Sequence, residues 1–293
     1  MAQRNNVKKH QKQNRKRKQR AEKIRRQTHA AKFESRPGVN EAIDYALERL
    51  DDGDFREGAK IIEKLKKKHR NHAYLTFAMG VLATRRDHID AAIGHFLRAT
   101  ELSPDFVEAH FNLGVAYHEK VKVPQLVESF RKVLEIGEPG SGVVEQARHI
   151  LDRIEQGIRE DDDVDLDTYV ESQNLFDHGV MQMNAGNWGP AITDFEASNE
   201  IVGHHAQVFG NMGICHAKLG NREAAIEAFD KALAIDPEYE PALLNREITL
   251  TLDDGCPLEG KVKTIEYYKD YSMGKRSYIE DFARDHNLLP NKS

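Results

Sequence analysis

The chain has 293 residues, of which 31% are charged and 39% hydrophobic, which is enough for one long array of small structural units or two shorter ones. No apolar run approaches the roughly 20 residues that a membrane-spanning helix requires, and no apolar stretch follows the basic N-terminus, so we expect a soluble protein without a secretory signal. The two cysteines, Cys215 and Cys256, form no Cys-x-x-Cys pattern, which favours a reducing, cytoplasmic location.

The first segment, residues 1–36, is strongly basic and has few large apolar side chains. Residues 1–32 hold 13 Lys and Arg and one acidic residue, Glu22, a charge of +12, whereas the remaining chain carries −17. Such a segment cannot bury enough apolar surface to offset its ordering entropy. We therefore expect a disordered basic arm at the N-terminus.

Three roles for this basic arm remain open. It can neutralise the phosphates of RNA or of the ribosome, which requires no fixed geometry. It can instead fold back onto the acidic body, or serve only as a solubilising tail. The residues expected to carry nucleic-acid binding are Lys8, Lys9, Lys12, Arg15, Lys16, Arg17, Lys18 and Arg20.

After Pro37-Gly38, residues 39–138 repeat a two-helix pattern with a period of about 34 residues. Residues at i, i+3 and i+4 share a helix face, so small and aromatic residues at these spacings predict two short, closely packed helices in each unit. One such pair cannot bury its apolar face alone and needs neighbours, which predicts an array of three units. In the unit that begins at Ala73 the pattern residues are Gly80, Ala92, Phe96 and Ala99.

Residues 138–142 interrupt this array with Pro and Gly. Apolar residues then recur at helical spacing over residues 141–159, which predicts an amphipathic helix that caps the first array. The acidic stretch 160–167 follows. A calcium loop would need Gly and Glu where Leu166 and Ser172 stand, so we expect a solvated linker.

The second array is predicted over residues 168–252, with two clear units and a degraded third, and closing helices are expected over residues 253–293. Its best unit spans residues 206–239, where Gly220-Asn221 separates the two helices and Asp236-Pro237 ends the second. In this unit positions 8, 20, 24, 27 and 32 are Gly213, Ala225, Phe229, Ala232 and Pro237.

This pattern of small, aromatic and proline positions resembles the tetratricopeptide repeat (TPR) family. The resemblance implies an all-α fold in which helix-turn-helix repeats of about 34 residues form a superhelix. It also implies a non-enzymatic scaffold or adaptor that binds a peptide or helix of a partner protein in a concave groove. The alternative function is that of an RNA- or ribosome-associated protein, tethered through residues 1–32.

The family lines its groove with repeat positions 2, 5, 6, 9 and 12. An Asn at position 6 suits recognition of an extended chain, because an amide both donates to and accepts from a peptide backbone. The aromatic residues can alternatively fill the groove or pack against the next helix. The candidate groove residues are Tyr74, Phe77, Phe111, Asn112, Phe176, Val180, Asn211 and Asn245.

Several kinds of site are not expected. The basic residues with which chaperone-binding members of the family hold a C-terminal carboxylate are missing, so we expect no EEVD-type chaperone tail. The histidines lack supporting ligands, and His204 and His205 would point about 100° apart on a helix. No Ser-His-Asp or Cys-His motif is present either. The sequence therefore predicts no catalytic residue, no metal and no cofactor.

Overall fold

The computed structural model describes residues 38–203 and 205–259. These residues form twelve α-helices and no strand. The described residues divide into two compact units, unit 1 ending at Ala109 and unit 2 beginning at His110. The predicted basic arm and most of the predicted closing helices lie outside the described residues.

Unit 1 is built from helical pairs. Helix α2 (Val39–Asp51) packs on α3 (Phe55–Lys66), and α4 (Ala73–Arg85) packs on α5 (Ile89–Leu102). The interval from the start of α2 to the start of α4 equals the interval from α3 to α5, and both match the period of the sequence pattern. The predicted all-α repeat is therefore present. The boundary of the unit falls within α6 (Val107–Glu119), so the units do not follow the predicted limits of the first array, 39–138.

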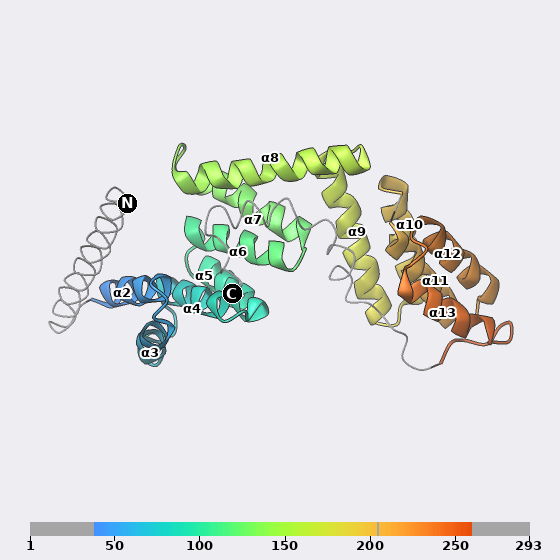
Figure 1. Ribbon diagram of the computed structural model, residues 1–293, viewed down its shortest axis with the longest axis horizontal. Coiled ribbons are helices and arrows are strands. Elements are labelled where there is room, and N and C mark those ends of the chain that lie inside the picture. The colour runs from blue at the N-terminus through green and yellow to red at the C-terminus, as the bar shows by residue number, and fades with distance from the viewer. Residues whose placement is uncertain (1–37, 204, 260–293) are drawn as a thin grey trace, which may run out of the picture. The chain divides into compact units, whose positions relative to one another are not determined.

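Unit 2 contains helical pairs of the same kind and one longer helix, α8. Helix α10 packs on α9, α12 on α11, and α13 on α12 (Figure 1). Helix α8, of 21 residues, contacts α7 and α9, and its expected capping role stays a prediction. The bounds are α7 (Val123–Ile136), α8 (Gly142–Asp162), α9 (Leu166–Asn184), α10 (Trp188–Ile201), α11 (Ala206–Lys218), α12 (Arg222–Ile235) and α13 (Glu240–Leu250).

The break between α8 and α9 is shorter than the acidic linker expected over 160–167. Helix α8 runs to Asp162, because carboxylates do not by themselves interrupt a helix. Asp163 ends it with a left-handed backbone, φ 56°. Asp165 then caps α9, and its side chain accepts a hydrogen bond from the Thr168 backbone N–H at 2.8 Å. Only residues 163–165 of the expected linker lie between the two helices.

Four of the repeats are held together by a glycine on the first helix and a phenylalanine on the second. A Cβ added to the glycine would overlap the ring in each of four repeats, and all four rings are at most 1% exposed. The first repeat differs, since Ala46 and Ile62 occupy the same two positions and both are fully buried. The four pairs are Gly80–Phe96, Gly114–Phe130, Gly179–Phe195 and Gly213–Phe229.

The turn between the two helices of each repeat contains a residue with a left-handed backbone at position 15. Three of these residues are glycines, for which this conformation is ordinary. The other two are Asp87 and Val121, with φ values of 60° and 54°. A β-branched residue is strained in this region, so Val121 is an outlier among the five turns. The glycines are Gly53, Gly186 and Gly220.

The last described residues pair with the turn that joins α11 and α12. The Gly255 N–H donates to the Gly220 carbonyl at 3.2 Å, and the Leu258 N–H donates to the Ala217 carbonyl at 2.8 Å. Lys218 donates from Nζ to the Leu258 carbonyl at 2.9 Å. Leu258 is buried in the process. Residues 255–258 are thus attached to the preceding repeat.

Candidate protein-binding site

The three candidate groove phenylalanines are buried. Phe77, Phe111 and Phe176 are 8%, 4% and 1% exposed. Each packs against the position-24 ring of its own repeat, with ring centroids 5.7 Å apart for Phe77–Phe96, 5.4 Å for Phe111–Phe130 and 5.2 Å for Phe176–Phe195. These distances are typical of packed aromatic pairs. The three rings therefore contribute to the interior of their repeats.

The position-6 asparagines differ in their accessibility. Asn112 is half-buried, Asn211 is 7% exposed and Asn245 is 1% exposed. Within the described chain neither amide atom of Asn245 has a hydrogen-bond partner. Leaving a buried amide unpaired costs on the order of 1–3 kcal/mol. Among these three amides, that of Asn112 is the most exposed.

Tyr74 and Val180 are the other accessible candidates. Tyr74 stacks on Phe77 with ring centroids 6.2 Å apart, and Phe106 packs edge-on against Tyr74 at 6.1 Å. The Tyr74 hydroxyl donates a hydrogen bond to the Asp44 carboxylate. Burial and then this hydrogen bond raise the pKa of Tyr74 above its usual value. Tyr74 is thus a neutral, fixed ring at the surface of unit 1.

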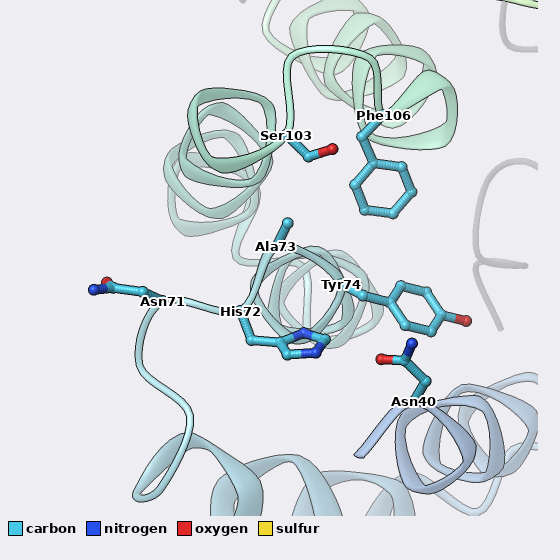
Figure 2. Close-up of a pocket in the computed structure, with 7 residues that line it drawn as sticks. All are labelled: Asn40, Asn71, His72, Ala73, Tyr74, Ser103 and Phe106. Carbon is cyan, nitrogen blue, oxygen red and sulfur yellow. The ribbon is translucent and has the colours of Figure 1, made fainter. Parts of the chain in front are cut away.

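A pocket of about 490 Å³ opens beside Tyr74 at the start of α4. The labelled side chains of Ser103, Phe106, Tyr74 and His72 surround the open space next to Ala73 (Figure 2). The His72 ring is held in place because its Nδ1 accepts a hydrogen bond from the Leu75 N–H at 3.3 Å. The remaining lining residues are Asn40 and Asn71.

Most residues of this pocket were not among the sequence candidates. Asn71, His72, Ser103 and Phe106 precede helices or lie in the connections between them, outside the groove positions of the family. One signal was available for Phe106, because an aromatic residue recurs at repeat position 34 as Tyr239. Position 34 is therefore a structural position of these repeats.

Tyr239 shows what the ring at position 34 does in the other well-formed repeat. Phe106 packs against Phe77 at position 5, with centroids 5.0 Å apart. In the later repeat position 5 is Gly210, and a Cβ there would lie 2.7 Å from the Tyr239 Cε1. Tyr239 is 8% exposed. The space left by the glycine is thus filled from position 34.

The candidate residues are divided between the two units. Tyr74 and Phe77 lie in unit 1, and Phe111, Asn112, Phe176, Val180, Asn211 and Asn245 lie in unit 2. The structure brings Tyr74 and Phe77 together. The eight basic candidates, Lys8, Lys9, Lys12, Arg15, Lys16, Arg17, Lys18 and Arg20, lie outside the described residues.

Other chemistry finds little support in the described part of the chain. No group of three His, Cys, Asp or Glu side chains there could hold a metal ion. Burial raises the pKa of the Cys215 thiol to about 12, which keeps it protonated and unreactive. Among the described helices, none is both long and apolar enough to cross a bilayer.

Two family models match the chain. The model described as "Tetratricopeptide repeat" matches residues 206–239, which include α11 and α12, and the one described as "TPR repeat" matches residues 86–121, which include α5 and α6. Both matches fall on the repeated two-helix pattern. They support the resemblance that the glycine, alanine and phenylalanine spacing indicates.

Several solved structures are similar to the chain. YrrB, described as a TPR protein with an unusual peptide-binding site, is 21% identical, covers 64% of this chain and 97% of its own, and has a TM-score of 0.31. The TPR2AB domain of yeast Sti1 in a pHSP90 complex is 16% identical to this chain. The match covers 72% of this chain and 82% of the Sti1 chain, with a TM-score of 0.36. A tetratricopeptide repeat protein from Parabacteroides merdae is 16% identical to this chain. The match covers 76% of this chain and 90% of the other, with a TM-score of 0.37.

Proposed function

Since the chain is a tetratricopeptide repeat protein, we propose that it acts as a scaffold or adaptor that holds a peptide or helix of a partner protein on the first helices of its repeats. The observation that carries this proposal is the set of half-exposed side chains at groove positions of these helices, Tyr74, Asn112 and Val180. Unit 1 offers the aromatic ring of Tyr74 for apolar contact, and unit 2 offers the amide of Asn112 and the aliphatic group of Val180, which are contacts that peptide recognition uses.

The proposal assigns different roles to the accessible and the buried candidates. Tyr74, Asn112 and Val180 contact the partner. Phe77, Phe111 and Phe176 hold the repeats in shape beneath them. The proposal includes a non-enzymatic function and a cytoplasmic location, and the two free cysteines, Cys215 and Cys256, are consistent with a reducing compartment. We further propose that the chain does not bind an EEVD-type chaperone tail. Calorimetry with such a peptide should therefore detect no binding.

Affinity capture with the full chain tests the scaffold proposal. Tyr74→Ala, Asn112→Ala and Val180→Ala, combined in one variant, should lose proteins that the native chain captures, as quantified by mass spectrometry. The matched control replaces exposed apolar residues of second helices, Leu97→Ser in α5 and Ile235→Ser in α12, which are 39% and 37% exposed. Equal capture by both variants would contradict binding on the first helices.

A second function rests on the basic arm. With a charge of +12 over residues 1–32, the arm offers phosphate neutralisation to RNA or to the ribosome. Its affinity for RNA should fall steeply with salt concentration. Replacing the eight basic candidates by Gln should abolish co-sedimentation with ribosomes, and undiminished co-sedimentation of that variant would contradict this function. The two functions are compatible, with the arm localising the protein and the repeats recruiting a partner.

A further inference from the structure

Carboxylates are close in sequence to the residues that line the pocket at the start of α4. The lining residues belong to three segments, residues 38–48, 71–84 and 101–109, which contain no Lys or Arg and are bounded by Arg49, Arg70 and Arg85. Lysines of the unit gather instead on α3 and just after it, over residues 60–68. The pocket segments carry six carboxylates, Glu41, Asp44, Glu48, Glu101, Asp105 and Glu108.

The pocket itself is aromatic and polar rather than acidic. Tyr74 and Phe106 present their rings to it, and none of its lining residues is Asp, Glu, Lys or Arg. The faces of aromatic rings attract the cationic groups of Lys and Arg. Asp44 stands at the hydroxyl of Tyr74, and Asp105 and Glu108 flank Phe106 in the sequence. An aromatic ring with a carboxylate close to it, as Tyr74 has in Asp44, suits a cationic side chain.

We propose that this pocket holds a Lys or Arg side chain of the chain's own basic arm, residues 1–36. The arm carries 14 Lys and Arg, so its charge complements that of the pocket segments. It also joins the described chain beside the pocket, because Asn40, which lines the pocket, is three residues after Pro37. An extended chain spans about 3.3 Å per residue, so cations ten or more residues before Asn40 can reach the rings.

The tether favours the arm over a free ligand. A segment joined to its binding site by a short flexible linker has an effective concentration in the millimolar range. A cation that binds the pocket only weakly as a free group would therefore occupy it when carried by the arm. Occupancy of the pocket by the arm couples the two binding functions proposed above. RNA that binds the arm frees the pocket, and a ligand that takes the pocket frees the arm by linkage.

Unit 2 is the competing destination for the arm. Residues 110–259 hold 28 Asp and Glu against 11 Lys and Arg, whereas residues 38–109 hold 13 against 11. Long-range attraction by net charge alone would draw the arm to unit 2. Docking in the pocket differs from such attraction in requiring the rings of Tyr74 and Phe106, and this difference can be measured.

Zero-length cross-linking of the full chain with a carbodiimide tests the proposal, since it joins lysines to carboxylates that are in contact. Arm lysines should link to Asp44, Asp105 and Glu108, as located by mass spectrometry. Mixing ¹⁴N- and ¹⁵N-labelled protein should give links within single chains. The links should be lost in about 1 M salt, where the Debye length is about 3 Å. The test is independent of the scaffold function, so either can fail alone.

Two variants separate the pocket from a general acidic surface. Asp44→Asn, which can still accept from Tyr74, and Phe106→Leu, which removes a ring, should each reduce links to Asp105 and Glu108 by about tenfold, the factor expected for roughly 1.4 kcal/mol. The control neutralises two carboxylates of α3, Glu57→Gln and Glu63→Gln, and should change nothing. Links mainly to unit 2, links between differently labelled chains, or links unaffected by Phe106→Leu would each overturn the proposal.

Discussion

Gly213 of α11 and Phe229 of α12 are complementary in size, since a Cβ on Gly213 would lie 2.5 Å from the Cε1 of the Phe229 ring. Gly213→Ala should therefore destabilise unit 2. Overpacking typically costs about 1–3 kcal/mol, which exceeds the roughly 1 kcal/mol that Ala gains over Gly in a helix. Trp188 is the only tryptophan and lies in unit 2, so its fluorescence during urea unfolding measures the change.

Two further variants test the reason for this effect. Gly157→Ala in α8, where a Cβ would meet nothing within 4 Å, should stabilise unit 2 by about 0.5–1 kcal/mol. Gly213→Ala combined with Phe229→Ile reproduces the Ala46–Ile62 pair of the first repeat. This pair should be more stable than the sum of the single effects by about 0.5–3 kcal/mol. Additive losses would contradict direct steric coupling.

Val121 is a site where glycine should be better than the native residue. Its φ of 54° costs a β-branched residue about 1–2 kcal/mol. Val121→Gly should therefore stabilise unit 2 by about 1 kcal/mol, as measured by the urea midpoint of Trp188 fluorescence. Val121→Ala retains a Cβ and should gain less. The reverse change, Gly186→Val, places a side chain in open space and should destabilise unit 2 through backbone strain alone. If Gly186→Val left the stability of unit 2 unchanged, the strain argument would be wrong.

Phe176 and Val180 should respond differently to truncation. Phe176 is 1% exposed and packs on Phe195, so Phe176→Ala should cost about 3–5 kcal/mol through the cavity it leaves. Val180 is half-buried, and Val180→Ala should cost about 1 kcal/mol or less. Denaturant unfolding compares the two. If Phe176→Ala retained full stability and lost only partner capture, Phe176 would be a contact residue rather than an interior one.

Gly220 should control the attachment of the last described segment. It has φ of 80°, and a Cβ there would lie 2.8 Å from the Gly255 carbonyl oxygen. Gly220→Ala should therefore release residues 255–258 and speed hydrogen exchange of the Leu258 amide, which bonds to Ala217. Gly186→Ala has the same φ but open space around it, so it should introduce the same strain without changing exchange at Leu258.

His216 should make unit 2 less stable in mild acid. Burial lowers its pKa below the usual value, and its Nδ1 is buried without a hydrogen-bond partner in the described chain. The unfolded chain then binds the proton more readily than the folded one. The stability is therefore complete above the unfolded pKa near 6.5 and decreases as the pH falls through the folded value.

The variant His216→Gln isolates this contribution from that of the other titrating groups. The midpoint of Trp188 fluorescence in urea should decrease less between pH 7.5 and about 5 in this variant than in the native chain. A native and a His216→Gln chain with parallel pH profiles would show that His216 does not contribute.

The repeat fold could be predicted from sequence because its signals are local. A small residue at position 8, a large apolar residue at position 24 and a chain reversal at position 15 recur every 34 residues on each side of α8. The limits of the elements were less certain. Helix α8 continues to Asp162 because its end depends on the backbone of one residue, Asp163, rather than on the acidic composition of the stretch.

The binding surface could be predicted only in part. Position 5 is read as a groove position, but the side chain there also reaches the position-24 ring, and packing placed Phe77, Phe111 and Phe176 inside. A helical pattern cannot distinguish these two outcomes, since both faces are adjacent on the helix. The accessible candidates that remain are Tyr74, Asn112 and Val180.

The sequence alone determined the helical repeat, its period and the basic arm, because each depends on residues close together in the chain. Only the tertiary structure decided which aromatic rings are accessible and where a pocket opens. That pocket brings Asn40 of the first repeat together with Tyr74 and Phe106 of the second repeat, which are near the beginning and the end of that repeat in the sequence. Its shape arises from how neighbouring helical pairs pack, and no spacing within a single repeat encodes it.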